Sequence, residues 1–261
     1  MGTLISWVNL ADAAAEISAT SEGAGLGVRN LLTEPVAEVW RCPPLASGAA
    51  AHVNVDLGGA RTIGLVALFA PRDGLLVAGY SVRLFLSAVA AGGDDVADVA
   101  LAPLDLPAGR GAWRYVLPVP AEVRFIQLRF VSGGAGEYLQ LGRLWIGPDF
   151  RPAVPFSRTD HARGVISAGL AERSTISGIL SAQRGATLRN PTFSLPLLTD
   201  AEADVVEDMA LAAGNFGQVV ASPRTQAGAA GFVLGRFETP PSPRIVTPLR
   251  WSASFSVVED L

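Results

Sequence analysis

The sequence predicts a mainly β protein, with an N-terminal jelly-roll β-sandwich followed by a C-terminal β-rich α+β domain that contains one helix. In the first half, short runs of alternating apolar and polar residues are separated by Gly, Pro and Asp turns, the pattern of sandwiches and jelly rolls. In the second half, strand-like runs lie on both sides of one helical pattern, which indicates an α+β arrangement.

Prolines and a glycine gather between Leu144 and Pro155, after a strand-like run. Proline cannot donate a hydrogen bond to a sheet ladder, so we expect a linker here. The expected domains are residues 1–148 and 157–261, joined by a Pro-rich linker over 149–156. Residues 1–149 hold 10 arginines and 14 acidic residues, a net charge of −4, whereas residues 150–261 hold 10 of each and are neutral overall.

Alternating runs in the first half predict the strands of the sandwich and the residues of its core. Side chains alternate between the two faces of a strand, so every second residue of each run faces the core. The runs are His52–Leu57, Ile63–Phe69, Ser81–Ser87, Arg124–Phe130 and Tyr138–Trp145. The expected core residues are Val55, Leu57, Leu65, Ile126 and Leu128.

The second half contains a helix that the sequence predicts over 199–213. Thr199 and Glu202 have the spacing of a capping box, in which each side chain satisfies a backbone N–H near the other. Gly214 supplies a stop signal at the other end. The chain closes on a strand over 251–257, with apolar residues on one face and Ser252, Ser254 and Ser256 on the other. This serine face is either the solvent side of a half-buried strand or a contact with another subunit.

The composition excludes several classes of protein. Charged residues make up only 17% of the chain and apolar residues 49%, which favours buried subunit surface. No apolar run reaches the roughly 20 residues that span a bilayer, so we expect no membrane insertion, and the first residues lack the pattern of a signal peptide. The net charge of −4 argues against binding nucleic acid by phosphate neutralisation.

Few residues suit catalysis or metal binding. The single cysteine, Cys42, excludes an internal disulfide and a cysteine-based zinc site. It is either a structural thiol or, beside Arg41, one with a lowered pKa. Residues 92–98 gather three carboxylates, which we interpret as an acidic surface turn rather than a cation site. No glycine-rich phosphate loop is present, so no cofactor and no metal are expected.

The two histidines do not form an obvious catalytic group. His52 is expected at the edge of a strand, and His161 follows Asp160 on the Pro-rich segment near Ser157. Adjacent residues on such a segment rarely adopt the geometry of a hydrolase triad. We therefore expect no catalytic residue, and a protein that is not an enzyme.

Five segments of the first half, in this order, carry a resemblance to a known family. They are Arg29–Leu32, Glu38–Arg41, Val53–Gly58, Ile63–Leu68 and Arg124–Arg129. Residues 5–148 resemble the discoidin-like, or galactose-binding-like, jelly rolls, also called coagulation-factor C-type domains. The resemblance implies an eight-stranded jelly roll whose loops at one end often bind glycans, lipids or proteins.

Two loops bear on what this resemblance implies. Family members often hold a structural calcium ion just after the Asn-Leu element, but Thr33–Ala37 offers one carboxylate there, so we expect no calcium. The turn Ala70–Leu76 could present Arg72 and Asp73 to a sugar, or be an ordinary solvated turn.

The second half is similar to another group of proteins. The run Arg189–Leu195 precedes the helix, and strands beginning at Gly217, at Gly231 and at Trp251 follow it. This order, over residues 150–261, resembles the tail-tip and minor tail proteins of long-tailed bacteriophages and gene transfer agents. The resemblance implies a baseplate component that contacts tail tube, hub or tape-measure proteins and copies of itself.

Three classes of function therefore compete. A structural protein of the virion tail, made in the bacterial cytoplasm, explains both domains and the low charge; its first domain would project towards a host surface glycan. A carbohydrate-binding adhesion module is the alternative and leaves the second domain without a role. A glycan hydrolase explains neither domain. We expect the tail-tip role, without nucleic acid as a partner.

Charge distribution in the second half suggests an assembly contact. The helix is acidic and the preceding segment is basic, so an acidic helix on one copy could face a basic surface on the next. The alternative is that both sets of charges are solvated within one subunit. The candidate contact residues are Asp204, Glu207, Asp208, Arg158, Arg163 and Arg184.

Overall fold

The computed structural model describes residues 2–71, 79–92, 96–104, 111–134, 138–157, 160–167, 170–173, 180–183, 185, 187–223 and 232–260. The chain divides into two compact units, which are described separately. The first, the sandwich unit, is built mainly from Ile5–Phe150; the C-terminal unit contains Arg151–Gln226 and Val233–Asp260 with the first four residues. Strands dominate the described residues and α1 (Asp200–Ala213) is their one α-helix, which confirms the mainly β fold class.

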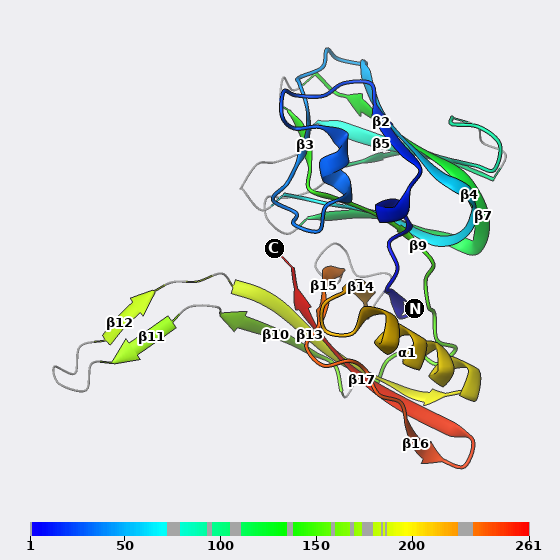
Figure 1. Ribbon diagram of the computed structural model, residues 1–261, viewed down its shortest axis with the longest axis vertical. Coiled ribbons are helices and arrows are strands. Elements are labelled where there is room, and N and C mark those ends of the chain that lie inside the picture. Colours follow the sequence, from blue (N-terminus) through cyan, green and yellow to red (C-terminus); the bar gives the residue numbers. More distant parts are fainter. Residues whose placement is uncertain are drawn as a thin grey trace. The chain divides into compact units, whose positions relative to one another are not determined.

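The sandwich unit contains one large antiparallel sheet and one small one (Figure 1). The large sheet has the order β2 (Glu16–Ala19), β4 (Ala50–Phe69), β7 (Ala112–Ser132), β5 (Tyr80–Ser87) and β6 (Ala97–Pro103), with β9 (Arg143–Gly147) also paired to β4. The small sheet pairs β3 (Trp40–Cys42) with β8 (Leu139–Leu141). The remaining elements of this part of the chain are β1 (Leu4–Ser6) and the 3-10 turns η1 (Leu10–Ala13) and η2 (Val28–Leu32).

Two long, bent strands connect the layers of this unit. The strand β4 is 20 residues long and runs beside β7, which is 21 residues long (Figure 1). The runs His52–Leu57 and Ile63–Phe69 were expected to be separate strands with a break at Gly58–Gly59, but β4 continues through both runs, so that expectation was wrong. The register shifts between Asp56 and Arg61, and Gly58 has φ +77°, which together allow the chain to bend without leaving the ladder.

The core of the sandwich unit lies between the layers and is apolar. Val53 and Ile63 of β4 and Ile126 of β7 are fully buried, and Trp40 packs against Phe130 with ring centroids 5.7 Å apart. The five core residues predicted from alternation are all buried, which confirms that prediction: Val55, Leu57, Leu65, Ile126 and Leu128.

The C-terminal unit is a second antiparallel sheet with α1 against it. The sheet has the order β1, β14 (Gln218–Ser222), β15 (Val233–Phe237), β17 (Arg250–Glu259), β13 (Thr187–Leu198) and β10 (Ala162–Ser167), with β16 (Arg244–Thr247) paired to β17. The hairpin β11 (Leu170–Arg173) and β12 (Leu180–Gln183) forms a separate pair. The helix packs on β17 and β13 (Figure 1).

The signals that delimit α1 are present in the structure. The Thr199 hydroxyl accepts from the backbone N–H of Glu202, and the Glu202 carboxylate accepts from that of Thr199, so the capping box is complete. Gly214 ends the helix with φ 51°. In the part of the chain that is described, no helix has the length and apolar character needed to cross a membrane.

The terminal strand β17 is integrated into this sheet. Phe255 is buried and stacks on Phe193 of β13, with ring centroids 5.1 Å apart. On the opposite face, the hydroxyl of Ser254 lies 3.2 Å from that of Ser194. The Ser256 hydroxyl donates to the side-chain oxygen of Asn190. The serine face therefore makes hydrogen bonds within the chain.

Candidate functional site

The outer surface of the large sheet in the sandwich unit gathers polar and aromatic side chains. Because Val53, Leu84 and Leu128 face the core, their neighbours along each strand face outward. We call this surface the polar face. Its residues are Glu16 and Ser18 of β2, His52, Asn54 and Asp56 of β4, Phe125, Gln127 and Arg129 of β7, and Arg83 and Phe85 of β5.

A hollow of about 210 Å³ lies on the polar face where β2, β4 and β7 meet. The side chains of Glu16 and Asp56 line it, opposite each other in the β2–β4 register. Phe125 lines it from β7, in register with Asp56. The remaining lining residues are Ser18, Asn54, Val55 and Ala91. The hollow thus combines an aromatic ring with carboxylate, amide and hydroxyl groups.

Arg124 fixes the position of two of these groups. Its Nε and Nη2 donate to the two carboxylate oxygens of Asp56, each at 2.9 Å. The same guanidinium lies over the Phe125 ring, with Cζ 4.6 Å from the ring centroid. These hydrogen bonds from Arg124, with one from the backbone N–H of Gly58, hold the pKa of Asp56 below its usual range. Asp56 is therefore an ionised acceptor held in place.

An amide pair borders the hollow. The side-chain nitrogen of Gln127 donates to the side-chain oxygen of Asn54 at 2.7 Å. This bond orients both amides, and it engages one nitrogen of Gln127 and one oxygen of Asn54. Each amide has a further polar group outside this bond, a donor on Asn54 and an acceptor on Gln127. The pair can therefore offer a ligand both kinds of hydrogen bond.

Beyond the amide pair, a row of basic side chains crosses three strands. Arg129 of β7 lies opposite His52 of β4 on one side and opposite Arg83 of β5 on the other. Arg83 donates from two nitrogens to the carboxylate of Asp98. Burial, and next the charge of Arg129, hold the pKa of His52 below its usual value. His52 lies near the start of β4, one residue beyond the last pair that this strand makes with β2, so its ladder partner is Arg129 of β7.

The chemistry of the polar face favours recognition over catalysis. Hydroxyl-rich ligands present closely spaced donors and acceptors, which carboxylates and amides satisfy, while an aromatic ring covers their apolar side. A general acid needs a raised pKa, whereas that of Asp56 is lowered. Within the described residues, no group of three or more His, Cys, Asp or Glu side chains has an arrangement that could hold a metal ion.

Several residues singled out from the sequence have other roles or lie outside the described residues. Arg72 and Asp73, the candidate sugar-loop residues, lie outside them. Cys42 is fully buried, and burial raises the pKa of its thiol, so a lowered pKa was the wrong alternative. The Nδ1 of His161 hydrogen bonds with the backbone oxygen of Thr192, which holds the ring against β13.

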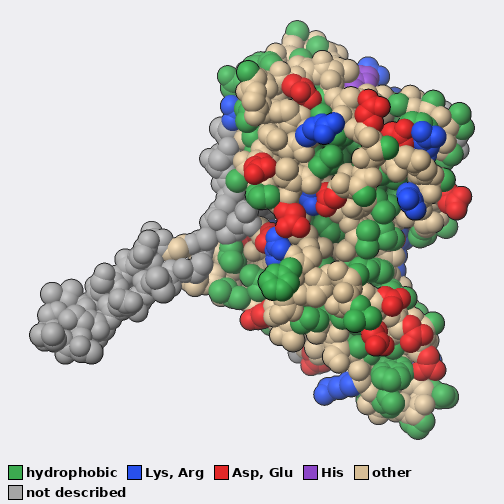
Figure 2. All heavy atoms as spheres, viewed as in Figure 1, with side chains coloured by type: hydrophobic (Ala, Val, Ile, Leu, Met, Phe, Trp, Pro, Cys, Tyr) green, Lys and Arg blue, Asp and Glu red, His purple; other side chains and the backbone are tan. Residues whose placement is uncertain are grey.

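The C-terminal unit has a separate groove of about 360 Å³ along α1. Asp204 and Glu207 line it from the helix, and Trp251 lines it from β17. The indole N–H of Trp251 donates to Asp200 at 2.7 Å. The opposite wall is proline-rich, and the other lining residues are Ala203, Ala210, Leu211, Pro240, Pro241, Ser242 and Pro243. Acidic and apolar side chains lie side by side over this part of the molecule, in the lower part of Figure 2.

The candidate assembly residues are only partly described. Asp204, Glu207 and Asp208 are exposed on α1, and Arg163 is exposed on β10. Arg158 and Arg184 lie outside the described residues. A further arginine of the basic segment, Arg189, donates to Glu259 within the chain at 2.7 Å. Arg189 is therefore paired within the chain, as the alternative of charges satisfied inside one subunit expects. The three acidic residues of α1 are exposed.

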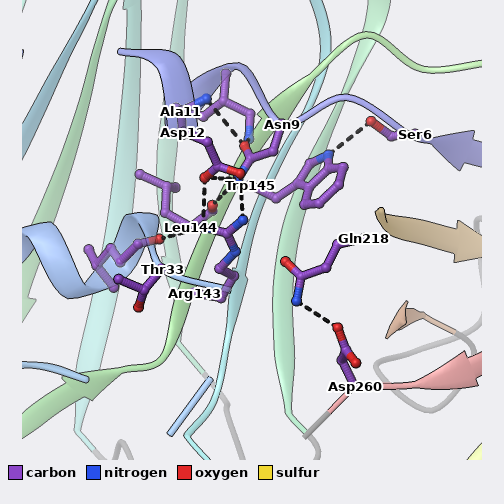
Figure 3. Close-up of polar contacts among 12 residues, drawn as sticks. Ser6, Asn9, Ala11, Asp12, Thr33, Arg143, Leu144, Trp145, Gln218 and Asp260 are labelled. Atoms are coloured by element: carbon purple, nitrogen blue, oxygen red, sulfur yellow. Dashed lines mark hydrogen bonds and ion pairs between the residues drawn. The ribbon is translucent and has the colours of Figure 1, made fainter. Parts of the chain in front are cut away.

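The buried arginine of the sandwich unit, Arg143, belongs to a structural cluster of polar contacts (Figure 3). Arg143 and Asp12 make an ion pair, and the Asn9 side chain donates to Asp12 and to the backbone oxygen of Leu144. The indole N–H of Trp145 donates to the hydroxyl of Ser6 at 2.9 Å. These bonds connect β9 to η1 and to Ser6, which precedes η1. The cluster lines neither the hollow of the polar face nor the groove along α1.

Sequence reasoning missed Glu16, Asn54, Asp56 and Phe125 as site residues. The usable signal was the alternation itself, because the same pattern that places Val53 and Val55 inside places Asn54 and Asp56 outside. Their convergence with Glu16 and Phe125 depends on strand order and register, which the pattern along one strand does not contain.

Comparisons with known proteins give structural neighbours but no family. No family model matches the sequence, and no curated protein matches it. Solved structures similar to this chain include a family 32 carbohydrate-binding module of C. perfringens NanJ in complex with galactose, with 15% identity, a TM-score of 0.42, and coverage of 54% of this chain and 98% of that one.

Two further solved structures are similar over the same share of the chain. The lectin domain of lectinolysin complexed with Lewis b antigen has 18% identity and a TM-score of 0.41, covering 54% of this chain and 96% of that one. Chitosan-binding module 1 of a chitosanase/glucanase from Paenibacillus sp. IK-5 has 14% identity and a TM-score of 0.40, covering 53% and 98%. None of the three comparisons supports the tail-tip resemblance of the second half.

Proposed function

We propose that the protein is a non-catalytic glycan-binding protein that holds a sugar in the hollow of its polar face. One observation carries the proposal: Phe125, Glu16, Asp56 and Asn54 converge from three strands around a space of about 210 Å³. Pockets for drug-sized ligands measure about 300–1,000 Å³, so this smaller hollow suits a single ring. The similar solved structures, at their low TM-scores, add no weight to this argument.

The hollow is organised before any ligand binds. Arg124 holds Asp56 from two nitrogens, and Gln127 holds Asn54. Pre-organised polar groups bind more tightly because less side-chain freedom is lost on binding. A sugar ring placed against Phe125 would accept from the Asn54 amide and donate hydroxyl protons to the carboxylates.

Mutation of the hollow tests the proposal directly. Phe125→Ala and Asn54→Ala are compared with wild type by calorimetry against lactose, galactose, fucose and chitosan oligosaccharides. We expect each substitution to weaken binding of the preferred sugar at least tenfold, about 1.4 kcal/mol. Phe125→Leu is a second variant, since leucine keeps apolar volume but removes the ring.

The matched control is Arg61→Gln, an exposed change on the same strand β4 that lies outside the hollow. Thermal unfolding confirms that each variant is folded. Unchanged affinity in folded Phe125→Ala and Asn54→Ala variants overturns the placement of the site. Absence of binding to every sugar in the panel, with folded wild-type protein, overturns the function.

The absence of catalysis is part of the proposal. Glu16 and Asp56 face each other across neighbouring strands, an arrangement that invites comparison with the paired carboxylates of retaining glycosidases, which lie about 5–5.5 Å apart. The Arg124 guanidinium stabilises the ionised form of Asp56, which disfavours it as a proton donor. The test is an assay for hydrolysis of aryl glycosides. Activity in the wild type that is lost in Glu16→Gln would show that the protein is an enzyme.

A second candidate function concerns the C-terminal unit, which would dock into a larger assembly such as a phage-type tail tip in the virion. The observation that favours it is a set of large apolar side chains exposed in this unit. Exposed apolar side chains mark interaction sites where they gather, and Ile245, Val246 and Leu249 lie close together in the chain, in and just after β16. The residues are Val165, Leu197, Leu211, Phe216, Ile245, Val246 and Leu249.

The occupant that the groove along α1 fits is an arginine-bearing segment of a second copy. Asp204 and Glu207 supply negative charge beside Trp251, a combination that accepts a guanidinium by charge and by ring contact. Analytical ultracentrifugation of the wild type, Asp204→Arg and Glu207→Arg tests it, with Glu122→Arg in the sandwich unit as control. We expect self-association only in the wild type and the control. A monomeric wild type at all concentrations overturns this docking.

A further inference from the structure

We infer that the row His52, Arg129 and Arg83 binds an anionic group, a carboxylate or a sulfate ester, on the glycan held in the neighbouring hollow. This inference rests on the proposed function and assigns the class of its ligand, an acidic saccharide. It starts from Arg129, whose Nε is buried and has no hydrogen-bond partner among the described residues. A buried donor without an acceptor is destabilising, and an anion bound beside this guanidinium would supply an acceptor.

The charges around Arg129 are unbalanced. Arg83 lies directly opposite it on β5, and like charges in opposed positions of a sheet are destabilising. Arg83 is neutralised by Asp98 of β6 through two hydrogen bonds. In the described part of the chain no carboxylate forms an ion pair with Arg129. One guanidinium charge on this face is therefore left for a ligand.

The remaining neighbours of Arg129 add no negative charge. His52 faces it from β4, and beyond His52 the next position belongs to Thr20, which accepts and donates hydrogen bonds there but is uncharged. Along β7 the flanking outward positions are Gln127 and Val131. The site is thus cationic, with a second positive charge available whenever His52 is protonated.

The position of the row matches a ligand that spans more than one sugar. Outward positions on a strand are about 7 Å apart, because each residue rises about 3.4 Å. Arg129 therefore lies about 7 Å along β7 from Gln127 and about 14 Å from Phe125. A saccharide seated in the hollow would pass the Asn54–Gln127 pair and present its next unit to Arg129.

The chemistry of Arg129 and His52 suits a carboxylate or sulfate better than a neutral hydroxyl. A guanidinium presents parallel N–H groups that match two oxygens of such an anion, and charge-assisted bonds of this kind are about twice as strong as neutral ones. Arg129 is half-buried, so its charge is less screened than that of an exposed side chain.

The first test compares neutral and acidic ligands that share one core: lactose, 3′-sialyllactose and lactose 3′-sulfate, measured by calorimetry. We expect at least tenfold tighter binding of one or both acidic ligands by the wild type. Arg129→Gln should remove this preference and leave lactose affinity unchanged. Arg61→Gln, an exposed arginine of β4, should keep the preference.

The outcomes separate the two proposals. Lactose binding that Phe125→Ala weakens, with no preference for either acidic ligand, overturns the anion site and leaves the proposed function standing. A preference that survives Arg129→Gln also overturns the assignment to this row.

A second test examines the row without any sugar. The chain has two histidines, so a His161→Asn background leaves His52 as the single histidine signal in an NMR titration. Sodium sulfate should raise the titration midpoint of His52 in the wild type but not in Arg129→Gln. If sulfate leaves the titration midpoint of His52 unchanged, the proposed anion site is overturned. A sulfate response in a protein that binds no sugar overturns the glycan function and the acidic-saccharide assignment together.

Discussion

Arg143 and Asp12 lie 131 residues apart in the sequence and face each other as an aligned pair, with Nη1 and Nη2 each 2.6 Å from a different carboxylate oxygen. The arginine side chain is 1% exposed, whereas that of the aspartate is 40% exposed. The pair joins η1 to β9, and its two members differ in how well water could replace the lost partner.

This difference predicts unequal effects of removing either partner. Asp12→Ala removes the aligned carboxylate from a buried guanidinium and should destabilise the unit by up to about 3–5 kcal/mol. Arg143→Met leaves a carboxylate that water reaches, so its cost should be smaller. Urea unfolding of both variants measures the difference. Equal stabilities of Asp12→Ala and wild type would show that the pair is energetically neutral.

Truncation of the core should be costly at Leu128. This side chain is fully buried on β7, and Leu128→Ala should destabilise the sandwich unit by about 2–5 kcal/mol through lost burial and the cavity that remains. Val119→Ala on the same strand is the control, because Val119 is 73% exposed and its substitution should stay within about 0.5 kcal/mol of wild type. Chemical denaturation decides between the two expectations.

The cap of α1 gives a third prediction. Thr199→Ala removes the hydroxyl that accepts from Glu202 and should cost about 1 kcal/mol. Thr199→Ser keeps the acceptor and should cost little. The two variants are compared by thermal unfolding followed through the helix signal in circular dichroism. A serine variant as unstable as the alanine variant would mean that the methyl group, and not the cap, is responsible.

His52 gives a pH dependence with a defined sign. Its folded pKa is lowered, by burial first and by Arg129 second, so folding disfavours the protonated ring. No stability is lost above the unfolded value of about 6.5, and stability falls as the pH drops below it towards the folded pKa. His52→Asn should therefore lose less thermal stability than wild type between pH 7.5 and pH 5. Identical losses in both proteins would contradict this origin of the pH dependence.

The sequence was sufficient where the structure depends on local pattern. Alternation placed Val55 and Leu128 in the core, and the spacing of Thr199 and Glu202 predicted the cap, because both depend on residues close in the chain. The break expected at Gly58 failed for a physical reason. Glycine with positive φ marks a bulge as readily as a turn, and the pairing of β4 with β7 across the bulge distinguishes the two.

The candidate site could be predicted only in part. The outward direction of Asn54 and Asp56 follows from alternation, but their neighbours Glu16 and Phe125 come from other strands. Register between strands is determined by packing and by the connecting loops rather than by one strand's sequence. For the same reason the opposition of Arg83 and Arg129 was not foreseeable, although each arginine was visible in its own run.

Cys42 gives the sandwich unit an intrinsic reporter of its own opening. Its thiol is fully buried on β3 and its pKa is raised, so a thiol reagent reacts only with molecules in which the small β3–β8 sheet has opened. Since the chain has one cysteine, the labelling rate reads a single site without any engineered probe. Ligand that binds only the closed unit should slow this labelling, which makes sugar binding measurable as protection of a residue on another sheet.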